Sequence, residues 1–281
     1  MPVTHDSPLI SAGELRQAIE SGAPPVVLDV RSGEDGRSGY LAGHVPAAVY
    51  VDLQTELSGP GEPAAGRSPL PEPAALQEAM RGWGIGAGND VVVYDNVRGL
   101  SAGRAWWVLR WAGHAAVRLL DGGLPAWAEA GGQLATEVPA PERGDVVVRP
   151  GSLPTFTAAD VIALPATGVL IDAREFSRYT GETEPLDPVA GHIPGAVSLP
   201  TTANLGSDGR FLAPDDLRAR FAAAGVQGSD PVVVYCGSGV TAAHEILALQ
   251  VAGLEGVMYP PSWSGWISDP SRPVATGSGS A

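Results

Sequence analysis

The chain has 281 residues, of which 44% are hydrophobic, so it can bury a substantial core and is too apolar for wholesale disorder. Its formal net charge is −14, and no strongly basic patch is visible, so nucleic acid and anionic membranes are not expected partners. All 17 basic residues are arginine, which excludes Schiff-base catalysis by lysine and the lysine of a phosphate-binding P-loop.

The first fifteen residues lack a basic region followed by an apolar run, so no signal peptide is expected. No apolar run reaches the ~18–20 residues that span a bilayer. We therefore expect a soluble, cytoplasmic protein, with a monomer favoured. Because Cys236 is the single cysteine and the histidines never form a close pair, no disulfide, metal site or cofactor is expected.

Short valine-rich runs predict buried strands, and amphipathic stretches between them predict helices, a pattern typical of an α/β fold with mainly parallel sheets flanked by helices. The predicted strands are Val26–Val30, Val91–Tyr94, Val169–Ile171 and Val232–Tyr235. The predicted helices are Ala74–Trp83, Ala102–Ala112, Asp215–Ala224 and Val240–Ala252. Asp215 or Asp216 is expected to cap the third helix.

The same landmarks occur twice in the same order, offset by about 140 residues, which is the length of a domain rather than of a solenoid repeat. The landmarks are Asp29-x-Arg31 and Asp172-x-Arg174, Gly43-His44 and Gly191-His192, Asp95 and Cys236, and Trp127 and Trp266. We predict an N-terminal domain over 1–138, a proline-rich linker over 139–154 and a C-terminal domain over 155–281. The linker run Val146–Val148 could add a strand to either domain.

Cys236 directly follows a predicted buried strand and precedes Gly237-Ser238-Gly239, after which a helix begins. Ligands of open α/β sheets bind at this edge, and the amides of a glycine loop at a helix start can surround an anion. Such a site favours the thiolate, which is the nucleophilic form of cysteine. The competing interpretation is a small, buried and inert cysteine.

The corresponding position of the first repeat is Asp95, so that repeat lacks the thiol and is expected to be non-catalytic. Features that both repeats share, namely Asp29, Asp172, His44 and His192, are expected to brace the fold through buried hydrogen bonds.

Cys236 to Ala242, together with the paired Asp-x-Arg segments and Gly191 to Ala196, resembles the tandem-domain rhodanese family of thiosulfate and 3-mercaptopyruvate sulfurtransferases. Tyr259, Ser262 to Ser264 and Trp266 are similar to its C-terminal signature. The resemblance implies two rhodanese-like domains and the transfer of a sulfane sulfur to a thiol or cyanide through a Cys236 persulfide.

The resemblance also implies which residues bind substrate. The loop amides of Gly237, Ser238, Gly239, Val240 and Thr241 would stabilise the anionic sulfur, and Arg178 would bind the donor carboxylate. Gly237-Ser238 is of the kind found in mercaptopyruvate-preferring members. The alternative for Arg178 is a surface arginine paired with Glu175 or Glu182.

Three departures from the family pattern leave the choice of donor open. Leu186 stands where the mercaptopyruvate enzymes often have arginine, and Pro260 and Pro261 follow Tyr259 in place of Asp-Gly. The acidic residue expected near the cysteine has no counterpart in Gly66 to Pro71, where Arg67 could occupy its neighbourhood instead.

Three rival functions are weighed against sulfur transfer. A cysteine phosphatase would need an arginine soon after the cysteine, but none occurs before Arg272. A dinucleotide fold usually opens on its glycine fingerprint, and here the fingerprint lies near the end of the chain. A persulfide-relay module without turnover of its own stays open.

Overall fold

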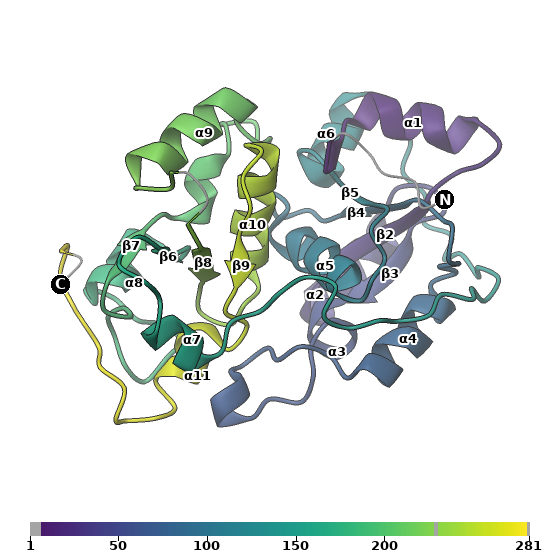
Figure 1. Cartoon of the computed structure of the whole chain (residues 1–281). Helices are drawn as coiled ribbons and strands as arrows, with labels where there is room; N and C mark the ends of the chain where they lie inside the picture. The colour runs from purple at the N-terminus through teal and green to yellow at the C-terminus, as the bar shows by residue number, and fades with distance from the viewer. Residues whose placement is uncertain (1–6, 228–229, 280–281) are drawn as a thin grey trace. The chain divides into compact units, whose positions relative to one another are not determined.

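The computed structural model describes residues 7–227 and 230–279, and its contacts divide the chain into two compact units (Figure 1). The first unit comprises Met1–Gly59, Leu70–Leu153 and Asp208–Arg210, and the second comprises Pro60–Pro69, Pro154–Ser207 and Phe211–Ala281. Residues 1–6, on which the prediction about a signal peptide partly rests, lie outside the described part. The second unit is therefore not one continuous stretch of chain.

The first unit is built on a five-stranded parallel sheet in the order β1-β5-β4-β2-β3. Its strands are β1 (Leu9–Ile10), β2 (Val26–Arg31), β3 (Val49–Asp52), β4 (Val91–Tyr94) and β5 (Val117–Leu120). Its helices are α1 (Ala12–Glu20), α2 (Gly33–Ala42), α3 (Leu53–Glu56), α4 (Pro73–Gly82), α5 (Leu100–Trp111) and α6 (Gly123–Glu129).

The second unit has a four-stranded parallel sheet in the order β7-β6-β8-β9. Its strands are β6 (Val169–Asp172), β7 (Ala196–Ser198), β8 (Val232–Tyr235) and β9 (Val257–Met258). Its helices are α7 (Ala158–Ile162), α8 (Phe176–Thr180), α9 (Pro214–Ala223), α10 (Thr241–Val251) and α11 (Ser262–Trp266), with the 3-10 turns η1 (Pro63–Ala65) and η2 (Thr201–Asn204).

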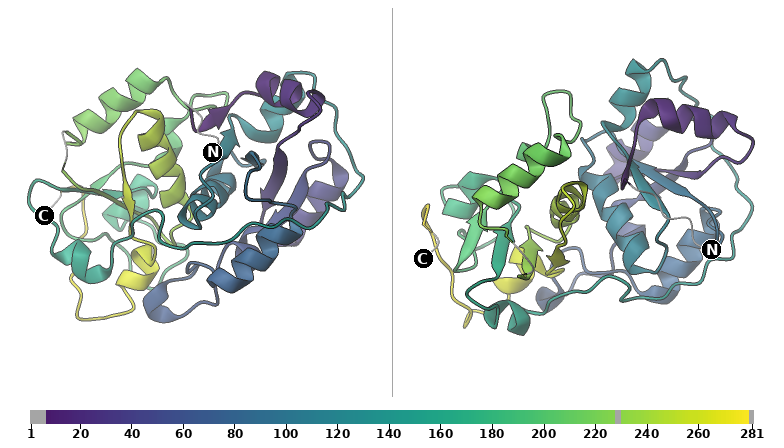
Figure 2. Two further views of the ribbon diagram at one scale, coloured as in Figure 1. Left: turned by 45° about the vertical axis from the view of Figure 1, so that its right-hand side comes forward. Right: turned by 45° about the horizontal axis from the view of Figure 1, so that its top comes forward.

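Helices cover both faces of each sheet (Figure 2). In the second unit, α9 and α10 pack together with α10 against β8 and β9, while α7, α8 and α11 share a core on the opposite face with Val233 and Tyr235 of β8. In the first unit, α1 and α6 enclose one core and α5 lies against β2, β4 and β5. Because β4 and β8 are buried along their whole length, valine on both faces is what such central strands require. The predicted α/β architecture is confirmed.

One predicted helix start is wrong. Neither Asp215 nor Asp216 caps α9, because Pro214 is its first residue and Ala213 takes the cap position without a side-chain hydrogen bond. Proline suits that first position since its missing N–H would have no partner within the helix. The two aspartates instead lie in the first turn, where their charge favours the helix dipole.

The linker run Val146–Val148 forms no strand and lies along the first unit. Val146 donates its N–H to the Ile85 carbonyl at 3.2 Å, and Val148 donates to the Gln77 side chain at 3.1 Å. Within the described part of the chain, no helix is long and apolar enough to cross a bilayer.

Candidate active site

Cys236 lies in the loop between β8 and α10, with 1% of its surface exposed. Its Sγ accepts a hydrogen bond from the N–H of Gly239 at 3.1 Å. That turn needs glycine because Gly239 has φ +80°, a conformation that side chains with a Cβ rarely adopt. The loop therefore directs the amide of Gly239, one of the five expected loop residues, at the thiol.

The start of α11 holds the backbone on both sides of the thiol. Ser262 Oγ accepts the N–H of Cys236 at 3.2 Å, and the N–H of Trp263 donates to the Cys236 carbonyl at 2.9 Å. The N–H of Ser264 donates to the carbonyl of Gly237 at 3.0 Å. The signature around Ser262 thus positions the cysteine loop rather than supplying a reacting group.

Two guanidinium groups lie over Gly237, the residue after the thiol. A Cβ built on Gly237 would lie 3.0 Å from Arg67 Nη2 and 3.4 and 3.5 Å from Arg178 Nη1 and Nη2. Arg178 comes from α8, whereas Arg67 comes from the segment Pro60–Pro69 of the second unit. The sequence placed Arg178 here as a donor-binding residue, and it placed Arg67 in the same neighbourhood without assigning it a role.

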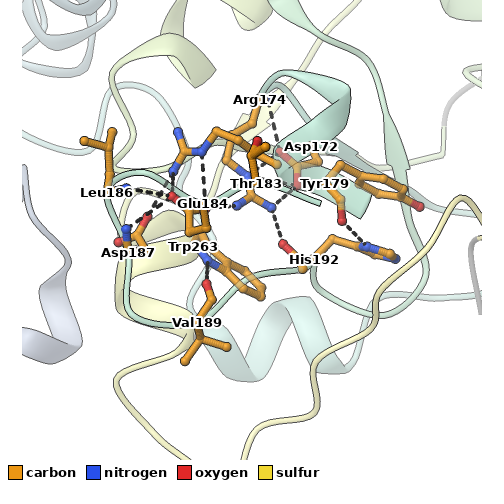
Figure 3. A network of polar contacts seen from close by, with 12 residues as sticks. Asp172, Arg174, Tyr179, Thr183, Glu184, Leu186, Asp187, Val189, His192 and Trp263 are labelled. Atoms are coloured by element: carbon orange, nitrogen blue, oxygen red, sulfur yellow. Dashed lines mark hydrogen bonds and ion pairs between the residues drawn. The ribbon is translucent and has the colours of Figure 1, made fainter. Parts of the chain in front are cut away.

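Two buried carboxylates hold these arginines. Arg178 donates from Nε and Nη2 to Glu184 at 3.2 and 2.7 Å, and from Nη2 to Asp187 Oδ2 at 3.1 Å. Arg67 Nη1 donates to Asp187 Oδ1. Arg178 is thus not paired with Glu175 or Glu182, which was the alternative reading. The environment of Glu184 and Asp187 appears in Figure 3.

The two carboxylates differ electrostatically. Burial opposes the ionisation of Glu184, but the hydrogen bonds from Arg178 and from the amides of Leu186 and Asp187 outweigh it, so the pKa of Glu184 lies below its ordinary value. Burial raises the pKa of Asp187, although the charge of Arg67 opposes that rise. Sequence reasoning missed both residues, and the Glu184-x-x-Asp187 spacing beside Arg178 was the available signal.

The repeated polar residues brace each unit, as expected. Arg174 donates to Asp172 from Nε at 3.0 Å and from Nη2 at 2.6 Å, and it lies over the ring of Trp263 (Figure 3). In the first unit, Arg31 holds Asp29 in the same way at 2.7 Å.

The two histidines repeat as well. His192 Nδ1 donates to the Tyr179 carbonyl at 2.7 Å and stacks on that ring, and His44 does the same with Tyr40 at 2.8 Å. Since a unit without a thiol has the same contacts, these contacts serve the fold.

The first unit shows what the loop binds when it has no thiol. Each oxygen of the Asp95 carboxylate accepts two backbone N–H groups at 2.8–2.9 Å, and the four donors are Val97, Gly99, Ser101 and Ala102. A loop between a strand and a helix start in this fold therefore surrounds an anion with backbone amides.

The remaining predicted site residues line the same loop in the second unit. Ser238, Val240 and Thr241 are partly exposed, while Gly237 and Gly239 are buried. Within the described residues, the hydroxyls of Ser238 and Thr241 make no hydrogen bond, so both are free to meet a ligand. Across residues 7–227 and 230–279, no cluster of three or more His, Cys, Asp or Glu side chains could hold a metal ion.

Comparison with known proteins agrees with this geometry. The model of the rhodanese-like domain matches the chain twice, over residues 11–130 and 157–269. The chain belongs to the rhodanese family. Its repeat is thus a repeat of the rhodanese domain, and the fold expected from the resemblance is confirmed.

Curated relatives of this rhodanese protein are sulfurtransferases. SseB of Mycobacterium tuberculosis, named as a thiosulfate sulfurtransferase, is 46% identical over 277 residues, covering 96% of this chain and 97% of that protein. The 3-mercaptopyruvate sulfurtransferase of Escherichia coli K12 is 35% identical over 260 residues, covering 88% of this chain and 91% of the relative. The chain is therefore placed among enzymes of the sulfurtransferase class.

Solved structures share the fold at low identity. A complex of EanB with ergothioneine has a TM-score of 0.84 at 21% identity, covering 96% of this chain and 70% of that one. YnjE has a TM-score of 0.83 at 24% identity, covering 96% of this chain and 68% of that one.

Proposed function

We propose that this sulfurtransferase moves a sulfane sulfur from 3-mercaptopyruvate or thiosulfate to a thiophilic acceptor, a thiol or cyanide, through a persulfide on Cys236. The observation that carries the proposal is the thiol itself: Sγ accepts an amide N–H at 3.1 Å, and two guanidinium groups lie over the next residue. An enclosed nucleophile beside cationic groups suits attack on an anionic sulfur donor.

The first half-reaction loads the enzyme. The Cys236 thiolate attacks the donor sulfur, and a new S–S bond forms. With 3-mercaptopyruvate the C–S bond breaks and its electron pair leaves as the enolate of pyruvate, which then takes a proton. With thiosulfate the S–S bond breaks and sulfite leaves with the electron pair. Arg178 would hold the anionic group of the donor, and Ser238 would hydrogen-bond the departing oxygen anion.

The second half-reaction regenerates the thiolate. The acceptor attacks the outer sulfur of the persulfide, the S–S bond breaks, and Cys236 keeps the electron pair. The Gly239 amide on Sγ supports the anionic sulfur at the start and end of the cycle. We further propose that the enzyme acts as a monomer in the cytoplasm.

Replacing the nucleophile tests the proposal. We expect Cys236→Ser to abolish turnover, because serine does not accept a sulfane sulfur, while its thermal unfolding stays close to that of the wild type. Mass spectrometry of the wild type after donor treatment should show Cys236 heavier by one sulfur atom, and acceptor should remove that mass. Turnover by the serine variant, or a wild-type thiol that never gains sulfur, would refute the proposal.

Catalytic turnover also separates an enzyme from a persulfide relay. Repeated cycles with small donors and small acceptors support the enzyme. A protein that takes up one sulfur and releases it to no small acceptor would be a relay.

A further inference from the structure

Arg67 reaches the cysteine loop from a distant part of the sequence. It is carried by Pro60–Pro69, which packs on the start of α11: its N–H donates to Ser264 Oγ at 3.1 Å. A Cβ on Gly66 would come within 3.0 Å of the same hydroxyl, so the contact is close. The backbone that presents Arg67 is therefore fixed to the segment that also fixes Cys236.

Asp187 sets the two guanidinium groups side by side. Its Oδ1 accepts from Arg67 Nη1 and its Oδ2 from Arg178 Nη2. Only 3% of the Asp187 side chain is exposed, so this bridge is shielded from water. Like charges would otherwise separate the two arginines, and the buried carboxylate between them opposes that repulsion.

The guanidinium nitrogens of Arg67 and Arg178 that do not bind Asp187 or Glu184 face the loop after Cys236. Within the described part of the chain, Arg67 Nη2 and Arg178 Nη1 donate no hydrogen bond, and these are atoms that lie closest to the Cβ position of Gly237. Two donors from two guanidinium groups, directed at one point next to a nucleophile, match the two oxygens of a carboxylate. Arg67 has 37% of its side chain exposed and Arg178 has 15%, so a solute can reach the pair.

We infer that Arg67 is a second donor-binding residue, which holds, together with Arg178, the carboxylate of a donor of the 3-mercaptopyruvate class. This inference rests on the proposed function and adds the donor class and the residue that selects it. One guanidinium comes from α8 and the other from the segment 60–69, so each oxygen of the carboxylate meets a different arginine.

Steady-state kinetics of Arg67→Ala test the inference. Because a hydrogen bond to a charged group contributes roughly 1.5–3 kcal/mol, we expect the KM for 3-mercaptopyruvate to rise about 10- to 100-fold. The yield of Cys236 persulfide at saturating donor should stay at the wild-type level, since the nucleophile is untouched. Arg67→Lys should recover part of the loss, because lysine keeps the charge but not the planar fork.

Two controls separate donor binding from other effects of the substitution. Arg143→Ala removes the same charge from an exposed ion pair with Glu78 and should leave the KM unchanged. In an Asp187→Asn background, where the ion pair of Arg67 is already removed, Arg67→Ala should still raise the KM, as expected for a group that contacts the donor.

The outcomes that overturn the inference are distinct from failure of the proposed function. An unchanged KM for 3-mercaptopyruvate in Arg67→Ala would remove Arg67 from the donor site, even if Cys236 forms its persulfide. An equal or larger rise in the KM for thiosulfate would overturn the assignment to a carboxylate. Failure of the wild type to form any persulfide would instead refute the proposed function.

Discussion

Glu245 is a fully buried carboxylic acid on α10, outside the candidate active site. Its Oε2 accepts from Asn204 Nδ2 at 2.6 Å, and Asn204 Oδ1 in turn accepts from Arg220 Nε at 2.9 Å. Burial raises the pKa of Glu245 to about 7, although hydrogen bonds from Thr201 and Asn204 and the charge of Arg220 oppose that rise. The folded protein therefore keeps this proton at a pH where the unfolded chain has lost it.

This difference makes stability depend on pH. Because the folded pKa is raised above the unfolded value of 4.5, the free energy of unfolding should fall as the pH rises from about 4.5 to about 7. At pH 8 the full cost is roughly 3 kcal/mol, at 1.36 kcal/mol per pKa unit. Glu245→Gln removes this titration, so its unfolding free energy relative to wild type should rise between pH 5 and pH 8. Denaturant unfolding of both proteins at pH 5 and pH 8 measures this difference in unfolding free energy. A difference that does not change with pH would contradict the raised pKa of Glu245.

Single residues differ in how far the sequence reveals their role. The place of Cys236 at the end of a buried strand could be predicted because its signal is local: a valine run, a thiol, two glycines and a helix start. Its role as the nucleophile stays a proposal. The sequence could place Arg67 only in the general neighbourhood of the cysteine, because its exact position depends on the packing of Gly66 against Pro261 and Ser264, far along the chain. A contact between distant segments leaves no periodic pattern in the sequence.

The loop between β4 and α5 corresponds to the cysteine loop of the second unit but has an aspartate in place of the thiol. Asp95 accepts four backbone N–H groups there, so its carboxylate does for the first unit what a bound anion would do. Burial raises the pKa of Asp95, and these four hydrogen bonds oppose the rise. The aspartate is thus a built-in part of the start of α5.

Asp95→Ala tests this role. The substitution leaves four N–H groups without their acceptor, and we expect a loss of about 3 kcal/mol in unfolding free energy. Asp95→Asn, which keeps one oxygen acceptor, should lose less. At a temperature where the variant is folded, its kcat should match the wild type, because the proposed nucleophile is Cys236. A large fall in kcat would show that the first unit takes part in catalysis, contrary to prediction.

At the scale of elements, the sequence predicts the long and central ones best. Val91–Tyr94 and Val232–Tyr235 match β4 and β8 to the residue, since full burial gives an uninterrupted valine run. Short elements such as β1 and β9, of two residues each, have no comparable signal because their pairing with β5 and β8 defines them. The run Val146–Val148 has the composition of a strand but forms none, because strand formation again depends on pairing. Its hydrogen bonds go to a loop and a side chain, not to a sheet edge.

At the scale of the whole molecule, the second unit includes a segment from the first half of the sequence. Pro60–Pro69 joins it although the chain before and after belongs to the first unit. The division into 1–138, 139–154 and 155–281 describes the repeat in the sequence and stays a proposal, since it assigns this segment by position alone.

Gly66→Ala tests whether the packing of the segment Pro60–Pro69 positions Arg67. Gly66 has φ +83°, and a Cβ there would lie 2.5 Å from the Pro261 carbonyl oxygen, so the segment must shift. We expect a lower melting temperature and a higher KM for donor, because Arg67 moves with the segment. Gly22→Ala is the matched control, since Gly22 has φ +81° with nothing within 4 Å of its Cβ position. If both variants change stability and KM alike, backbone strain alone accounts for the effect.

The enclosure of Cys236, at 1% exposure, governs which molecules it can meet. The proposed persulfide would add an S–S bond of about 2 Å, so the reacting sulfur would lie one atom beyond Sγ. An acceptor thiol would then need to reach only the outer sulfur, whereas an alkylating reagent must reach the buried Sγ itself. The enzyme should therefore accept bulky thiols as sulfur acceptors and yet react slowly with bulky alkylating reagents. An exposed cysteine could not combine these two properties.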